Sequence, residues 1–313
     1  MRGTVALTGA TGFVGHAIAQ RLIGDGWRVR AMTRRPSEAL AGLGAATWAG
    51  DLGSVERLRE FVTDADAVVH CAGLVRARRA DDFAAVNAGG TARLLSAVRE
   101  QGNPARFLYI SSLAARHAEI SHYAASKRAA EEAVRAAAVD IDAAVVRPPA
   151  IYGPRDRATL PLFQLLARGW LLMPSPATAR FSLLHVDDLA GAVAHLLEQP
   201  RLGGVTVEPD DGRDGGYDWP ALAAIAAARL GRPVRPVRLP HALLLAIAAG
   251  NQTIARLVGQ APMLSLDKLR EMRFPDWVSE PPQSAILDDW APRLRFEEGF
   301  AQTLAWYRTA GWV

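Results

Sequence analysis

The alternation of short apolar runs with longer amphipathic stretches constrains the fold of this chain more than any other feature. Apolar runs that predict strands lie at residues 4–8, 28–33, 67–71, 107–111 and 143–147. Between them, apolar residues recur at helical spacing over residues 14–23, 55–61, 83–101 and 123–138. Strands that alternate with helices predict an α/β fold, in which a doubly wound parallel sheet carries helices on both faces. Ligands of such a sheet bind beyond the carboxyl ends of its strands.

The regular alternation stops after residue 147. The chain has 313 residues, 50% of them hydrophobic and 22% charged, which is typical of one large globular domain or of a large and a small one. We expect the sheet domain over residues 1–150 and a smaller, mostly helical substrate-binding lobe over residues 151–313, with a segment at about 180–200 returning to the sheet domain. Helical patterns in the lobe lie at residues 158–169, 218–230, 240–259 and 297–309.

A glycine-rich turn follows the first predicted strand and opens the first predicted helix. Its three glycines permit a tight turn, close approach of the backbone to a pyrophosphate and close helix packing, while the helix N-terminus favours negative charge. This context favours a dinucleotide site in a Rossmann-type domain over the alternative, an ordinary strand-to-helix turn. The residues expected to contact the cofactor here are Gly9, Thr11, Gly12, Phe13, Val14 and Gly15.

The end of the second strand indicates which dinucleotide is preferred. A protein that prefers NAD usually carries an acidic residue there, but this chain has Thr33, followed by Arg34 and Arg35. A guanidinium pairs bidentately with a 2′-phosphate, so the sequence predicts a preference for NADP, with NAD also possible. The alternative is a solvated basic turn. A third strand is expected between this turn and Asp51, and Asp51 and Leu52 after it are expected at the adenine.

Three residues form the predicted catalytic set. Ser112 ends the fifth strand, and Tyr123 and Lys127 lie four residues apart, on one face of the next helix. A phenol with a reference pKa of about 10 is a poor acid or base at neutral pH, but a nearby cation favours its phenolate. We expect Tyr123 to exchange a proton with the substrate oxygen and Ser112 to orient that oxygen.

Lysine is rare in this chain, which makes Lys127 stand out. Lysine and arginine together number 36, and only Lys127 and Lys268 are lysines. A guanidinium is bulky and planar, whereas an ammonium is compact, and a compact cation suits a position beside a phenol and a cofactor ribose. We therefore expect Lys127 to act in catalysis and Lys268 to be a surface residue.

With these motifs in this order, the sequence resembles the short-chain dehydrogenase/reductase superfamily, in particular its extended branch, the NAD(P)-dependent epimerase/dehydratase family. Further similar motifs lie at residues 68–73, 86–91, 147–154 and 185–190. Asp188 in the last of these is expected to cap a helix, with His185 packed behind it. The resemblance implies additional cofactor contacts from Cys71, Ala72, Gly73, Asn87, Ser111, Tyr123, Lys127, Pro148, Ala150 and Ile151.

The resemblance implies hydride transfer at nicotinamide C4 to or from a hydroxyl or keto carbon, with Tyr123 as the acid or base. Nucleotide-sugar members usually carry an asparagine where this chain has Ala150, so a small or lipophilic substrate is favoured, as in dihydroflavonol reductases and 3β-hydroxysteroid dehydrogenases. Two alternatives stay open. One is a nucleotide-sugar epimerase or dehydratase with bound NAD(P), and the other is a non-catalytic NADPH-binding scaffold.

Composition narrows the remaining possibilities. The net charge of +4 comes from scattered arginines, so nucleic-acid binding is not expected. One cysteine, Cys71, and the lack of a signal-peptide pattern predict a cytoplasmic protein. The spacing of the histidines predicts no metal site.

No segment predicts an integral membrane helix. The apolar stretch 239–255 is expected to be buried or to cover a cleft, with membrane contact as the alternative. A homodimer is possible.

Overall fold

The structure is a computed structural model that describes residues 2–101, 105–281 and 284–313. These residues form two compact units, and each unit is made of three chain segments. The first consists of Met1–Pro148, Leu189–Pro209 and Pro281–Ala291, and the second of Pro149–Asp188, Asp210–Glu280 and Pro292–Val313.

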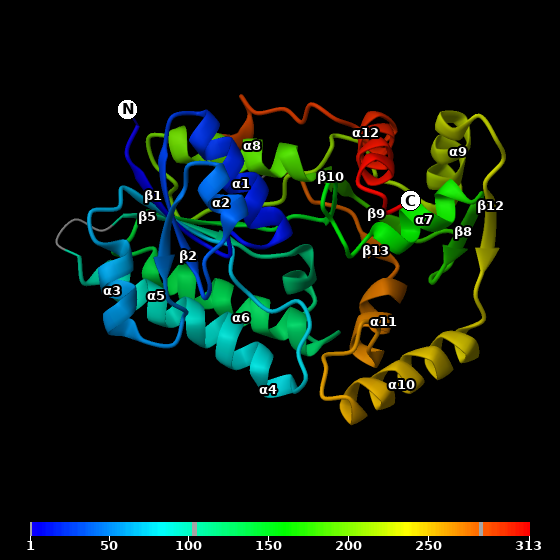
Figure 1. The fold of residues 1–313 in the computed structure, drawn as a ribbon, viewed down its shortest axis with the longest axis horizontal. Coiled ribbons are helices and arrows are strands. Elements are labelled where there is room, and N and C mark those ends of the chain that lie inside the picture. Colours follow the sequence, from blue (N-terminus) through cyan, green and yellow to red (C-terminus); the bar gives the residue numbers. More distant parts are fainter. Residues whose placement is uncertain (1, 102–104, 282–283) are drawn as a thin grey trace. The chain divides into compact units, whose positions relative to one another are not determined.

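The first unit contains a seven-stranded parallel sheet with the strand order β11-β6-β5-β4-β1-β2-β3 (Figure 1). The predicted α/β fold with a doubly wound parallel sheet is thereby confirmed. Residues of β1, β4 and β6 are buried along their whole length, as expected for strands covered on both faces. The strands are β1 Thr4–Thr8, β2 Arg28–Thr33, β3 Ala46–Ala49, β4 Ala67–His70, β5 Arg106–Ile110, β6 Ala143–Val146 and β11 Thr206–Val207.

Helices cover both faces of this sheet. Apolar residues of α3, α5 and α6 form one core layer against it, including Phe61, Leu94 and Val134, while α1 and α2 lie on the opposite side (Figure 1). The helices are α1 Phe13–Gly24, α2 Glu38–Gly42, α3 Val55–Val62, α4 Ala80–Phe83, η1 Ala84–Ala88, α5 Gly89–Arg99, η2 Leu113–Arg116, α6 His122–Ala137, α8 Val186–Glu198 and η3 Ala285–Leu287.

The helix predicted over residues 83–101 is not continuous. It comprises the end of α4, one turn of π-helix in η1 and then α5. The π-helical turn contains Asn87, whose side chain is buried. Wide turns of this kind are frequent at functional sites.

The second unit combines helices with three small parallel sheets of two strands each. Tyr152, Phe163, Phe296, Phe300 and Tyr307 form an aromatic core, with Phe163 and Phe300 stacked at a centroid distance of 5.3 Å. The helices are α7 Leu160–Ala167, α9 Trp219–Leu230, α10 His241–Leu257, α11 Leu266–Arg273 and α12 Phe296–Thr309. The strand pairs are β7 Ala150–Tyr152 with β10 Leu183–His185, β8 Trp170–Met173 with β12 Arg235–Arg238, and β9 Arg180–Phe181 with β13 Asp276–Trp277.

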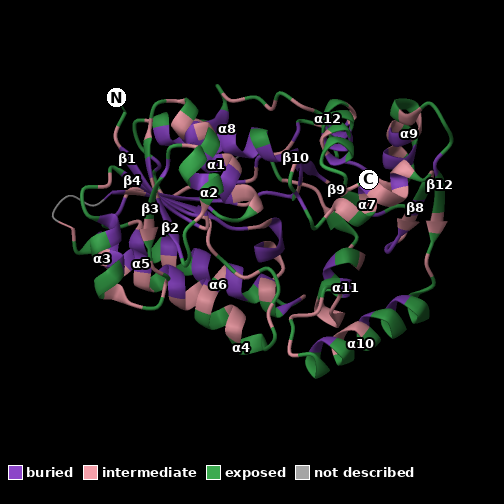
Figure 2. Cartoon of the chain, in the orientation of Figure 1, coloured by how far each residue is buried: buried purple, intermediate pink, exposed green. Residues whose placement is uncertain are grey.

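Two expectations for this half of the chain differ from the structure. Only Leu244, Ala248 and Ala255 of α10 are buried (Figure 2), so the expected burial is wrong, whereas His241 and Leu245 of this helix line a cavity. Asp188 does not cap α8: its carboxylate accepts hydrogen bonds from the backbone N–H groups of Arg293 and Leu294, both at 3.0 Å.

Candidate cofactor and catalytic site

The glycine turn between β1 and α1 has no room for side chains. A Cβ atom on Gly15 would lie 2.2 Å from the carbonyl oxygen of Gly9, and one on Gly9 would lie 2.7 Å from the nitrogen of Ala72. Gly9 also has a φ of +75°, which L side chains rarely adopt. The turn therefore requires glycine at both positions, and it brings α1 and the residues after β4 close together.

The N-terminus of α1 is open toward an anion. Gly12 stands at the N-cap and supplies no side-chain cap, the first turn contains no acidic residue, and Thr11 and Gly12 are exposed. Phe13 and Val14 are half-buried. Uncapped N–H groups at the positive end of a helix dipole favour a phosphate group, so this turn fits the pyrophosphate of a dinucleotide.

The residues predicted to bind the adenosine end follow β2 and β3. Thr33 is buried at the end of β2, and Arg34 and Arg35 after it are exposed. Asp51 is exposed and accepts a 2.8 Å hydrogen bond from the N–H of Gly53. Leu52 is half-buried and packs against the core layer of α3, α5 and α6. Two guanidinium groups therefore stand in solvent just beyond a buried strand end.

His70, which sequence reasoning missed, links the end of β1 to the π-helical turn η1 through hydrogen bonds. Thr91 donates its hydroxyl hydrogen to the carbonyl of Asn87 at 2.6 Å, so its oxygen accepts from Nε2 of His70 at 2.9 Å. Nδ1 of the neutral ring then accepts from the hydroxyl of Thr8 at 2.7 Å, and Thr8 accepts from the N–H of Ala72 at 3.1 Å. Burial lowers the pKa of His70 to about 3, and the charge of Lys127 acts in the same direction.

Asn87 holds the chain that leaves β4. Its Oδ1 accepts from the N–H of Leu74 at 2.7 Å, and its Nδ2 donates to the carbonyl of Leu74 at 3.0 Å and to Oγ of Ser126 at 2.9 Å. Cys71 and Ala72 are half-buried and Gly73 is exposed. Burial raises the pKa of the Cys71 thiol to about 11, so this cysteine stays protonated at neutral pH. The amide of Asn87 therefore fixes the loop that is expected to lie along the cofactor.

Lys127 is buried, and its ammonium group lies beside this loop. Nζ donates a 2.8 Å hydrogen bond to the carbonyl of Ile110, lies 4.8 Å from the centre of the Tyr109 ring, and would be 3.5 Å from a Cβ atom on Gly73. Burial lowers the pKa of Lys127 to about 8, with Cys71 and Glu131 acting in the opposite direction. The cation is held rigidly at the carboxyl ends of β4 and β5.

Tyr123 lies in the first turn of α6 and is half-buried, with its ring at an edge-on distance of 6.1 Å from that of Phe83. The helix begins here because the hydroxyl of Ser121 accepts from the N–H of Ala124 at 3.0 Å. The capping serine therefore determines where the phenol stands relative to the end of β5.

Ser111 and Ser112 differ in their surroundings. Ser111 is buried and donates its hydroxyl hydrogen to Oε1 of Glu131 at 2.6 Å. Ser112 is half-buried, and its Oγ accepts from the N–H of Ala114 at 3.2 Å as the N-cap of η2. Within the described residues, the Ser112 hydroxyl donates no hydrogen bond, so its hydrogen can be donated to a substrate oxygen.

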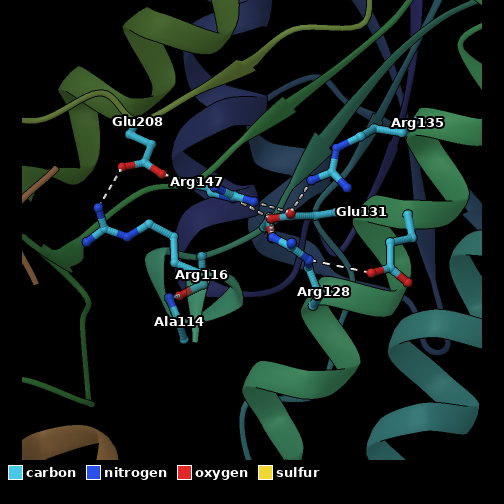
Figure 3. A network of polar contacts seen from close by, with 10 residues as sticks. Ala114, Arg116, Arg128, Glu131, Arg135, Arg147 and Glu208 are labelled. Carbon is cyan, nitrogen blue, oxygen red and sulfur yellow. Dashed lines mark hydrogen bonds and ion pairs between the residues drawn. The ribbon is translucent and has the colours of Figure 1, made fainter. Parts of the chain in front are cut away.

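A buried network of charges, shown in Figure 3, supports the turn that carries Ser112. Glu131 has no solvent exposure and receives two hydrogen bonds from Arg147, at 2.6 and 2.8 Å, and one from Arg135 at 2.9 Å. Arg147 also contacts Glu208 at 3.2 Å, and Glu208 contacts Arg116, the last residue of η2, at 3.3 Å. Sequence reasoning missed this network, because Glu131, Arg147 and Glu208 lie on or directly after separate elements of the chain.

The last predicted cofactor contacts fall in both units. Pro148 belongs to the first unit, where its carbonyl accepts from the N–H of Leu113 at 3.0 Å. Ala150 and Ile151 belong to the second unit, in β7, paired with Leu183 and Leu184 of β10. Within residues 2–101, 105–281 and 284–313, no three His, Cys, Asp or Glu side chains are grouped so that they could hold a metal ion.

Comparison with known proteins identifies the family. Residues 5–207 match the model of the NAD dependent epimerase/dehydratase family. The chain is 41% identical to a ceramide reductase of Caulobacter vibrioides over 315 aligned positions, which cover 100% of this chain and 96% of the relative. It is 26% identical to a dihydroflavonol 4-reductase of Zea mays, over 65% of this chain and 69% of the relative.

The fold is also similar to that of solved structures. A UDP-glucuronic acid 4-epimerase from Bacillus cereus, solved in complex with UDP-glucuronic acid and NAD, has a TM-score of 0.76 and 15% identity, with 98% of this chain and 99% of that one covered. The resemblance predicted from the motifs is confirmed, as is the prediction of an enzyme. The chain belongs to the NAD dependent epimerase/dehydratase family and is an NAD(P)-dependent enzyme of the kind that includes reductases, epimerases and dehydratases.

Proposed function

We propose that this protein is an NADPH-dependent reductase that converts a ketone of a ceramide-like lipid into a secondary alcohol. The observation that carries the proposal is the 41% identity with a ceramide reductase along the whole chain. Ala150 supports a lipid over a nucleotide sugar, because a methyl group cannot replace an asparagine as a hydrogen-bond partner of a diphosphate.

The first unit supplies the residues that hold the cofactor. The N–H groups at the start of α1 bind the pyrophosphate, and Arg34 and Arg35 bind the 2′-phosphate that distinguishes NADP from NAD. Lys127 holds the nicotinamide ribose beside Gly73. When bound, NADPH supplies the hydride that forms the new carbon–hydrogen bond.

Tyr123 supplies the proton. As the carbonyl carbon is reduced, the phenol of Tyr123 gives its hydrogen to the substrate oxygen, which becomes the hydroxyl, and a phenolate remains. The ammonium of Lys127 stabilises that phenolate, since an adjacent cation favours the charged form of the phenol. Ser112 donates its free hydroxyl hydrogen to the same substrate oxygen and orients it toward Tyr123.

The test uses the purified protein, NADPH and a ceramide in which the secondary alcohol of the long-chain base is replaced by a ketone. We expect consumption of NADPH matched by formation of the alcohol, measured by absorbance and by mass spectrometry. Replacing Tyr123 by Phe removes the proton donor and is expected to reduce kcat by on the order of 10²- to 10⁴-fold. Ser112→Ala is expected to reduce kcat less, because Tyr123 remains.

Three outcomes would refute the proposal. Isomerisation of a UDP-sugar without net oxidation of NADPH would favour an epimerase. Full activity of the Tyr123→Phe variant would contradict the assignment of Tyr123 as the proton donor. Binding of NADPH without turnover of any ketone would favour a non-catalytic scaffold.

The preference for NADP, the homodimer and the cytoplasmic location stay predictions. The single cysteine supports the cytoplasmic location.

A further inference from the structure

The outer face of α10 is apolar and exposed. Leu244 and Ala248 form a small core cluster with Leu269 of α11, and Ala255 of α10 is also buried. At helical spacing, Leu243, Ile247, Gly250, Ile254 and Leu257 form a stripe on the other side. Leu243 and Ile247 are each 47% exposed, Ile254 is 63% exposed and Leu257 is 83% exposed.

Exposed apolar side chains are concentrated in the segment of residues 243–263. Of the twelve large hydrophobic side chains left most exposed in the part of the chain that the structure describes, seven lie between residues 243 and 263. Figure 2 shows most of α10 as exposed. Contiguous apolar patches on a protein surface mark sites of contact with proteins or membranes.

The charge along α10 itself has one sign, because the helix contains Arg256 and no acidic residue. Between Asp218 and Asp267 the sequence has five arginines and no acidic residue. Arg238 ends β12, three residues before α10, His241 is the first residue of α10 and Arg256 lies in its last turn. All three are exposed. An apolar helix face flanked by cations is complementary to a surface with apolar chains beneath anionic groups.

A cavity beside the first turns of α10 adds two further cations. It has a volume of about 430 Å³, and its lining includes His241, Leu245, Leu269, Arg270 and Arg273. Arg270 pairs with Asp267 at 3.1 Å, and Arg273 donates to the carbonyl of Pro174 at 3.1 Å. The helix pair α10 and α11 therefore combines an apolar stripe with basic groups on two elements.

We propose that α10 and α11 dock this protein onto an anionic lipid bilayer, with the apolar stripe of α10 lying in the interface between headgroups and acyl chains. Among the described residues, no helix combines the length and the apolar character needed to cross a bilayer. A second copy of the chain fits this face poorly, because α10 carries no acidic residue that could pair with Arg256 of the other copy. The proposal rests on this surface alone and does not require the proposed substrate.

The experiment is flotation of the full-length protein with vesicles of phosphatidylcholine, with and without phosphatidylglycerol. We expect binding to the anionic vesicles that weakens as salt is added, because salt screens the arginines. Ile247→Glu and Ile254→Glu each place a charge in the stripe and are expected to lower the partition coefficient by more than about tenfold. Arg256→Gln removes one cation near the surface and is expected to lower it by about fivefold.

Matched variants control for the chemistry of each change. Val139→Glu places the same charge at an apolar residue outside this face, which is 88% exposed, and is expected to bind vesicles like the wild type. Arg201→Gln is the control for Arg256. NADPH binding, followed by fluorescence, confirms that each variant is folded.

Three results would overturn the proposal. The first is no binding to anionic vesicles, and the second is equal binding to vesicles without phosphatidylglycerol. The third is a dimer in sedimentation analysis that Ile247→Glu dissociates, because a second copy would then cover this face. Failure to reduce a ceramide ketone would leave the vesicle result unaffected, so the two proposals fail separately.

Discussion

Nζ of Lys127 donates a 2.8 Å hydrogen bond to the carbonyl oxygen of Ile110, at the end of β5. The ammonium is buried, and Gly73 lies beside it, so the larger guanidinium group cannot take its place. Lys127→Arg is therefore expected to lower kcat by about 10²-fold or more despite keeping the charge, measured as NADPH oxidation with a ketone substrate. Lys268→Arg, at the other lysine, is the control and is expected to be fully active. A Lys127→Arg variant with near-normal activity would remove the catalytic role of Lys127.

The exposed pair Arg34 and Arg35 is expected to select the cofactor. Hydrogen bonds to charged groups contribute about 1.5–3 kcal/mol, so replacing both arginines by Ala is expected to raise the Kd for NADPH by about 10- to 100-fold. The Kd for NADH, which lacks the 2′-phosphate, is expected to stay within about twofold. Both constants are measured by fluorescence titration, with Arg201→Ala as the control. A wild-type protein that binds NADH more tightly than NADPH would contradict the predicted preference.

The glycines of α1 provide a matched pair of substitutions. A Cβ atom on Gly15 would lie 2.2 Å from the carbonyl oxygen of Gly9, whereas one on Gly24 meets nothing within 4 Å. Gly15→Ala is therefore expected to distort the turn and weaken NADPH binding by about tenfold or more. Gly24→Ala is expected to leave binding unchanged and to raise the free energy of unfolding by about 0.5–1 kcal/mol. Equal NADPH affinity of the two variants would show that the turn does not hold the cofactor.

His70 is expected to make the protein sensitive to acid. Burial lowers its pKa to about 3 in the folded protein, from an ordinary value of 6.5, so between these pH values only the unfolded chain binds the proton. The contribution of His70 to stability is full above pH 6.5 and is lost as the pH falls, by about 1.4 kcal/mol per pH unit. Urea unfolding of the wild type and of His70→Asn between neutral and mildly acidic pH measures this difference. Parallel pH dependences of the two proteins would refute it.

The Glu131 network is expected to contribute strongly to stability. Removing one partner of a buried ion pair costs about 3–5 kcal/mol, because the other charge stays buried without compensation. Glu131→Gln is expected to lower the free energy of unfolding by up to about that amount, since Arg147 and Arg135 lose their common carboxylate while Arg147 keeps its contact with Glu208. The neighbour Glu132 is exposed and pairs with Arg128 at 3.5 Å, so Glu132→Gln is expected to cost less than about 1 kcal/mol. Denaturant unfolding compares the two, and equal losses would contradict the burial argument.

Much of the first unit was predictable from the sequence, because its signals are local. The apolar runs and the helical spacing predict the main strands and helices of the sheet to within a few residues, and the glycine turn predicts where β1 meets α1. The same patterns place Ser112, Tyr123 and Lys127 in the segment that follows β5. The resemblance to the family follows from these motifs, and the family match confirms it.

The missed features depend on contacts between distant residues. Glu131 looks like an ordinary charged residue on a helix, and only Arg147 and Glu208 make it a buried one. His70 gains its role from Thr8 and Thr91, which lie on other elements. The apolar composition of α10 predicts burial, but composition carries no information about whether a partner element covers the helix.

The strand order of the sheet has a consequence for the newly synthesised chain. β6 ends at residue 146, but its outer neighbour β11 lies at residues 206–207. While the ribosome makes the residues between them, the backbone of β6 has an unpaired edge, which is a template for aggregation. In the finished sheet that edge is closed by a strand of only two residues, and so short an edge strand offers little backbone for another chain to pair with.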